Sequence, residues 1–296
     1  MLTQGLLEKI GFTDEQILEY NKYDAIYGDE VEKYTAMFMV DKADYKETLE
    51  KLHNHIGNAV HTYTLDLIFV LHCSEFLRLE YLKNNINEEL FYNAMNDITY
   101  KLRECLSVKK VFGHSNVANW YYGFFVLKRF ALGRLQYDIL EFPDEDITIL
   151  GKEIKKGSFV LGCHIPSSGR LTQELCLDSY KKAYEFFKDR LGDDGILVIR
   201  CASWLLYEPY LNVFGATSNT GLFMRNFKVY SNLERVSFQN GWRLFGVDCP
   251  ADVDYNNLPA DTTMRRSFID YMKKGGNHGV GIGAILFDGE NILTNH

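Results

Sequence analysis

One stretch, 157–187, constrains the fold of this chain more than any other part of it. Its residues are GSFVLGCHIPSSGRLTQELCLDSYKKAYEFF, an apolar run followed by a Pro-Ser-Ser-Gly loop and an amphipathic pattern. This order predicts a strand, a tight loop and the N-terminus of a helix. The N–H groups of such a terminus have no partners within the helix, and the helix dipole is positive there. The stretch therefore predicts an anion site, although a plain turn with Thr172 as N-cap has the same pattern.

The expected strand has two different faces, because successive side chains point to opposite sides. Leu161, Cys163 and Ile165 share one face, and Gly162 and His164 share the other. An open strand edge can offer its backbone groups to an extended ligand. We therefore expect His164 to face a cleft.

The loop that follows combines several features that suit a diphosphate. Ser167, Ser168, Gly169, Arg170 and Thr172 supply a permissive turn, hydroxyl donors, a cation and a helix cap.

The overall charge argues against nucleic acid as a partner. The chain has 32 basic and 40 acidic residues among 296, which gives a net charge of −8, and the charges form no long blocks. The N-terminal residues lack the pattern of a secretory signal, so we expect a cytoplasmic protein. The most apolar window, 67–73, is far shorter than the ~20 residues that span a bilayer, so no membrane partner is expected.

The length of the chain fits two domains. Apolar spacing predicts helices in the first ~130 residues, with Thr13 as a cap followed by Gln16. Aromatic residues crowd 120–137, where the pattern becomes strand-like. We therefore expect a helical domain over 1–132 and a second domain over 133–296.

The second half alternates between strand and helix patterns, which predicts an α+β fold with α/β layers and a mixed sheet flanked by helices. A further segment, over 218–233, follows a helical patch expected over 204–213. The expected strands and helices are the strands 134–141, 159–165, 196–201, 242–247 and 283–287, the helices 172–191 and 262–274, and a helical patch over 204–213.

The six cysteines are widely spaced and form no C-x-x-C pair, so neither a zinc site nor a disulfide framework is predicted. Most are expected to be buried thiols. His53, His55 and His61 lie close in sequence, but no other ligands complete a metal set.

Several motifs resemble a known family. G-x-x-V-x-G-C-H-I-P-S-S-G-R-L-T, C-A-S-W-L-L at 201–206 and S-N-T-G-L-F-M-R-N-F at 218–227 look like the C-terminal domain of bacterial GNAT-like N-acyltransferases. The resemblance runs from about residue 135 to the end, and the helical half is similar to the N-terminal domain that usually accompanies it. The resemblance implies an acyl-CoA-dependent N-acyltransferase that moves an acyl group, acetyl by default, to the primary amine of a small molecule.

The resemblance also implies where CoA binds. The pantetheine arm would lie along Leu161 to Ile165, including Cys163 and His164, and the pyrophosphate on Ser167, Ser168, Gly169, Arg170 and Leu171. The superfamily's usual Gly-x-Gly or Gly-x-Ala loop is absent, and this loop has one glycine. A non-catalytic module that binds an acyl carrier or a nucleotide would also fit that departure.

Direct transfer requires a base for the amine, donors for the oxyanion and an acid for the thiolate. Backbone N–H groups of 163–165 could polarise the carbonyl. His164 is the first candidate base and Glu208 its rival, and Tyr207 or Tyr210 could protonate the thiolate. Each could equally be a structural residue.

Two further interpretations remain open. Cys201 and His164 could form a thiolate pair, which would make the protein a cysteine-dependent hydrolase. Trp120, Tyr121 and Tyr122 could line an acceptor cleft between the domains or belong to its core.

Overall fold

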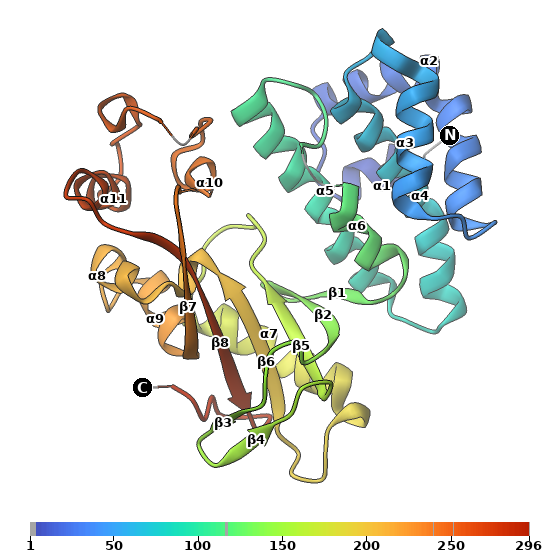
Figure 1. Cartoon of the computed structure of the whole chain (residues 1–296). Coiled ribbons are helices and arrows are strands. Elements are labelled where there is room, and N and C mark those ends of the chain that lie inside the picture. Colours follow the sequence, from blue (N-terminus) through green and yellow to red (C-terminus); the bar gives the residue numbers. More distant parts are fainter. Residues whose placement is uncertain (1–3, 116–117, 239, 251, 296) are drawn as a thin grey trace. The chain divides into compact units, whose positions relative to one another are not determined.

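The structure is a computed structural model, and it describes residues 4–115, 118–238, 240–250 and 252–295. The chain divides into two compact units, Met1–Ala131 and Leu132–His296. Figure 1 shows that the first consists of helices and that the second contains the large sheet. This architecture confirms the expected fold class.

The first unit is built from amphipathic and buried helices whose ends are set by capping residues. Thr13 accepts a hydrogen bond from the N–H of Gln16, whose side chain in turn accepts one from the N–H of Thr13, so the expected capping box is present. No helix in the described ranges is long and apolar enough to cross a membrane. The elements are α1 (Gln4–Lys9), α2 (Asp14–Met39), α3 (Tyr45–Ile56), the 3₁₀ turn η1 (Gly57–Ala59), α4 (Thr62–Lys83), α5 (Glu88–Lys109) and α6 (Ala118–Phe125).

His114 lies in the core of this unit with no exposed surface. Its Nε2 is 3.0 Å from the carbonyl oxygen of Ile98, and its ring stacks on Tyr121. Burial lowers the pKa of His114 to about 3, because the charged imidazolium would be desolvated.

This buried histidine predicts that the first unit loses stability in acid. The unfolded chain binds a proton near pH 6.5 whereas folded His114 stays neutral, so stability falls as pH decreases from there towards 3. We expect His114 to account for a loss of about 2 kcal/mol at pH 5 relative to pH 8. Urea unfolding of wild type and His114→Gln at both pH values measures the difference. An equal pH dependence in the two proteins would contradict the prediction.

The second unit is built around one mixed sheet with the strand order β1-β2-β5-β6-β8-β7. Strands β5 and β6 are parallel, and the pairs β2–β5, β6–β8 and β7–β8 are antiparallel. The strands are β1 (Arg129–Leu132), β2 (Leu135–Glu141), β5 (Phe159–His164), β6 (Leu197–Ser203), β7 (Lys228–Arg235) and β8 (His278–Phe287), with a separate hairpin of β3 (Ile147–Ile149) and β4 (Lys152–Ile154). The helices are α7 (Gln173–Phe187), α8 (Leu211–Phe214), α9 (Asn219–Arg225), α10 (Gly241–Phe245) and α11 (Thr263–Lys273), with the 3₁₀ turns η2 (Lys188–Arg190), η3 (Trp204–Leu206), η4 (Glu208–Tyr210) and η5 (Tyr255–Asn257).

The two faces of the sheet carry different layers. Helix α7 covers the face that includes Cys163, where Cys176 and Tyr180 are fully buried (Figure 1). The β3–β4 hairpin packs on the opposite face, where Ile149 and Ile154 join an apolar cluster with Val160. We call these the helix face and the hairpin face.

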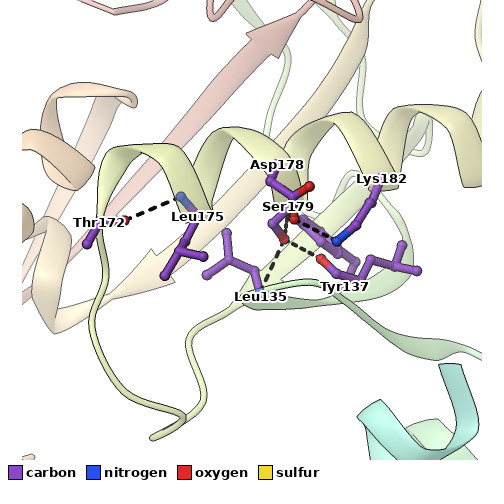
Figure 2. A network of polar contacts seen from close by, with 8 residues as sticks. Leu135, Tyr137, Thr172, Leu175, Asp178, Ser179 and Lys182 are labelled. Carbon is purple, nitrogen blue, oxygen red and sulfur yellow. Dashed lines mark hydrogen bonds and ion pairs between the residues drawn. The ribbon is translucent and has the colours of Figure 1, made fainter. Parts of the chain in front are cut away.

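Helix α7 is fastened to β2 through one buried serine (Figure 2). The Ser179 hydroxyl donates to the carbonyl of Leu132 and accepts from the N–H of Leu135 at 3.2 Å. The Tyr137 hydroxyl lies 2.9 Å from the same oxygen. The contacts fix α7 relative to the strand that borders β5.

The structure corrects two sequence predictions. The segment 242–247, expected as a strand, lies mostly in helix α10, and the segment 218–233, for which no element type was predicted, contains helix α9 and the first part of strand β7. The last strand begins at His278 and not at Gly283. Its glycines lowered the strand signal, but they are required because a Cβ at Gly281 would overlap the carbonyl of Leu206.

Candidate active site

Strands β5 and β6 separate at their C-terminal ends. They pair only at Leu161–Ile199 and Gly162–Arg200. Each strand continues beyond these pairs while remaining paired with its outer neighbour, to His164 in β5 and to Ser203 in β6. Backbone N–H and C=O groups between the two ends are therefore available to an extended ligand.

The loop after β5 is held by Arg134, a side chain that sequence reasoning did not identify. Its guanidinium, which is 9% exposed, donates to the carbonyl oxygens of Pro166 at 3.0 Å, Gly169 at 3.0 Å and Arg170 at 2.9 Å. Gly169 has a φ of 105°, a conformation that favours glycine. The expected turn is thus present, and the Arg134 guanidinium fixes the orientation of three of its peptide groups.

The orientation of these carbonyls determines where the loop's N–H groups point. In a trans peptide the N–H is opposite to the C=O. The N–H groups of Ser167, Arg170 and Leu171 therefore point away from the Arg134 guanidinium. All three residues belong to the set expected to bind a pyrophosphate.

The N-terminus of α7 follows directly after the loop. Thr172 is its N-cap and accepts a hydrogen bond from the N–H of Leu175 at 3.4 Å. The first helical residue, Gln173, exchanges two side-chain hydrogen bonds with Asn226, at 2.6 and 3.1 Å. Asn226 has no exposed surface and lies just after α9. The helix terminus is thus tied to the end of α9.

His164 is the last residue of β5 and lies on the hairpin face, as the alternation predicted. Its Nε2 is 2.8 Å from the Oδ2 of Asp138 on the adjacent strand β2. The side chains are 31% and 17% exposed, respectively. A carboxylate in this position can orient an imidazole and stabilise its protonated form.

Glu208 is not close to His164. Its carboxylate accepts a hydrogen bond from the Asn232 amide on β7. The register places Asn232 opposite Gly281 and Ser203, which is nearly level with His164 but three strands away. Three strand spacings amount to about 14 Å. The two candidate bases therefore belong to separate parts of the sheet.

Tyr207 lies on the helix face, where its ring covers the position of Gly279. It is 2% exposed and packs edge-to-face on Tyr210 at 4.9 Å. Burial, together with Glu234 and Tyr271, raises the pKa of Tyr207. Its hydroxyl therefore stays protonated at neutral pH.

The pair of Cys201 and His164 proposed for a hydrolase does not form. Cys163 and Cys201 are buried on the helix face, whereas His164 is on the hairpin face. The hydrogen bond with Cys201, together with burial, raises the pKa of the Cys163 thiol well above its ordinary value. Burial raises that of Cys176 to about 12. These thiols lack the electropositive, accessible surroundings of a nucleophile.

The three aromatic residues near the boundary have different environments in the first unit. Tyr121 has no exposed surface, and Trp120 donates through Nε1 to Asp97 at 2.9 Å. Tyr122 is 45% exposed and, with Phe38 among others, lines a pocket of about 370 Å³. Among the described residues, no group of three His, Cys, Asp or Glu side chains could hold a metal ion.

Sequence reasoning missed Asp138, Arg134 and Asn226. Asp138 sits in a strand that alternates like any other, and only its pairing with β5 brings it to His164. The dipeptide Gly133–Arg134 between two strands indicates a turn, but not the destination of the arginine side chain. No local signal in the sequence could have identified their contacts.

Residues 129–285 match the family model of the GNAT-like C-terminal domain, and residues 1–127 match that of the N-acyltransferase N-terminal domain. No curated protein matches the chain.

Solved structures of acyltransferases share the fold. One in complex with decanoyl-CoA and teicoplanin is 16% identical with a TM-score of 0.71, and the alignment covers 96% of this chain and 87% of that one. Another in complex with decanoyl-CoA is 18% identical with a TM-score of 0.68, covering 95% and 86%. The two family matches together span nearly the whole sequence. The chain therefore belongs to the GNAT-type N-acyltransferase family, in which an N-acyltransferase N-terminal domain precedes a GNAT-like C-terminal domain.

Proposed function

We propose that the protein transfers an acyl group from acyl-CoA to a primary amine of a small molecule in a ternary complex. One observation carries the proposal: β5 and β6 separate immediately before a loop whose N–H groups are oriented by Arg134 and which opens into α7. The pantetheine arm would lie between the strand ends, at Cys163 to Ile165. The pyrophosphate would accept hydrogen bonds from the loop and from the first turn of α7.

The donor and the acceptor would approach from opposite faces of the sheet. The loop and α7 bring the CoA to the helix face, whereas His164 and Asp138 lie on the hairpin face. Ala202, whose Cβ points to the same face as His164, is exposed. An amine reaching the thioester from this face would meet the imidazole first.

The amine nitrogen attacks the thioester carbonyl carbon, and the C–S bond breaks as the amide C–N bond forms. His164 takes the proton from the attacking amine, oriented by Asp138. Backbone N–H groups at the end of β5 stabilise the oxyanion. The CoA thiolate receives a proton from a donor such as Tyr207, whose phenol stays protonated.

Acyl-CoA binding and thiol release test the proposal. Acetyl-, octanoyl- and decanoyl-CoA are compared by thermal shift, where a ligand at 100 times its Kd stabilises by about 2.7 kcal/mol. We expect at least one of them to stabilise the protein. With that donor, a panel of small primary amines should accelerate release of the CoA thiol, measured with a thiol reagent against reactions without amine.

The outcomes separate the proposal from its rival. Absence of stabilisation by every acyl-CoA would exclude the acyltransferase function. Stabilisation without thiol release for any amine would favour a non-catalytic module that binds an acyl carrier, which is the reading that the single loop glycine supports.

A further inference from the structure

Strands β5 and β6 also separate at their N-terminal ends, which are the ends opposite to the proposed CoA site. Each strand begins two residues before the first pair that joins them, at Phe159 in β5 and at Leu197 in β6. A pocket of about 420 Å³ opens at this end, a size typical of small-molecule sites. The beginnings of both strands line it, together with β4, η2 and the loop that follows η2.

The walls of this pocket are largely apolar. Ile154 of β4 and Val198 of β6 are buried and belong to the apolar cluster of the hairpin face. Phe159, Leu191 and Ile196 are half-buried and add further apolar surface. The walls therefore suit the apolar part of a small molecule.

One ion pair joins the two sides of the pocket. The ammonium of Lys152 on β4 contacts the carboxylate of Asp194 in the loop before β6. The other carboxylate oxygen of Asp194 accepts a hydrogen bond from the N–H of Ile196 at 3.1 Å. The hydrogen bond from Lys152 lowers the pKa of Asp194. These two charges therefore neutralise each other while they hold the hairpin against the start of β6.

Arg190 supplies a charge that the protein leaves unpaired. Its guanidinium carbon lies 5.9 Å from the centre of the Phe159 ring. Within the ranges that the structure describes, this exposed side chain has no hydrogen bond or ion pair. Lys155, another cation of the pocket, contacts Glu153 at 3.4 Å, and both of those side chains are more than half exposed. An unpaired guanidinium beside apolar walls favours an anion that is attached to an apolar group.

We propose that this pocket binds an organic anion, with a carboxylate or phosphate head on Arg190 and an apolar chain along the walls. The planar guanidinium offers parallel N–H donors that match either head group. An inorganic anion would leave the walls uncovered, whereas an uncharged chain would leave the guanidinium unpaired. Phe159 and His164 are the two ends of β5, about 17 Å apart, so this site is separate from the proposed CoA site.

Calorimetric titration with octanoate, octyl phosphate and octylamine tests the assignment, because the three probes share one chain and differ in the head group. We expect at least one of the two anions to bind wild type about tenfold or more tightly than octylamine does. The better anion identifies the head group. Arg190→Gln should abolish this preference.

Two further variants make the test specific to the pocket. Ser158→Glu adds a carboxylate at an exposed position of the lining and should weaken anion binding about tenfold by repulsion. Lys188→Gln is the matched control, because Lys188 is an exposed cation of the same 3₁₀ turn as Arg190 but is not among the residues that line the pocket. It should bind the anion as wild type does. Circular dichroism checks that each variant is folded, and Ser158→Glu gives an independent answer if Arg190→Gln is not.

Three results would overturn the assignment. The first is that neither anion binds wild type better than octylamine does. The second is that the preference persists in folded Arg190→Gln, which would place the anion elsewhere on the protein. The third is an equal loss in Lys188→Gln, which would show a general effect of surface charge. Stabilisation by acyl-CoA should be the same in all three variants, so failure here leaves the proposed function untouched.

Discussion

Replacing His164 with glutamine is expected to lower kcat for acyl transfer by about 10²- to 10⁴-fold, the usual contribution of a general base. The imidazole lies at the separated ends of β5 and β6 and contacts Asp138 at 2.8 Å. Glutamine can still contact Asp138 but cannot accept the amine proton. The KM for acyl-CoA should change little, because the loop that would bind the pyrophosphate is intact. Steady-state kinetics with the best donor and amine measures both constants.

The variant Asp138→Asn tests whether Asp138 only orients the His164 ring or also stabilises its protonated form. The amide occupies the same space and can still contact the ring, but it cannot stabilise the imidazolium, so kcat should fall less than in His164→Gln. His55→Gln is the control, since His55 is also hydrogen-bonded, to Tyr34 at 2.7 Å, but lies in the helical unit. Unchanged kcat in His164→Gln would remove the histidine from the mechanism and leave the base to be found among other groups.

Replacing Arg134 with glutamine is expected to weaken CoA binding by about two orders of magnitude. Its three hydrogen bonds hold the carbonyls of Pro166, Gly169 and Arg170, so without them the loop must be ordered when CoA binds. Ordering about two residues costs roughly 3 kcal/mol, which corresponds to about a 150-fold change in Kd. Arg134→Lys should have a smaller effect, because an ammonium cannot reach all three carbonyls together.

Arg129→Gln is the matched control for lost stability. Arg129 is 7% exposed and also donates to a backbone carbonyl, but its acceptor is Trp120 in helix α6 and not the loop after β5. Both variants should unfold more easily than wild type, whereas only Arg134→Gln should lose CoA affinity. Normal CoA affinity in a folded Arg134→Gln protein would show that the loop does not bind the pyrophosphate.

The sequence predicted the local elements wherever one signal was strong. The capping box at Thr13, the alternation of β5 and the loop before α7 depend only on residues near one another in the chain. Predictions failed where a tertiary contact outweighed a local preference. Strand β8 extends through glycines because Leu206 and Tyr207 lie against them, and segment 242–247 forms a helix despite its aromatic and β-branched residues.

By itself, the sequence determined that a strand, a one-glycine loop and a capped helix follow one another, which is the local pattern behind the proposed CoA site and the candidate base His164. Tertiary structure alone decided which groups lie beside them. Asp138 reaches His164 because β2 pairs with β5, and Arg134 reaches the loop from the turn before β2. Glu208 is carried away from His164 because β6, β8 and β7 follow β5 in the sheet. Such relations depend on strand order and register, which arise from packing between distant segments and leave no local pattern in the sequence.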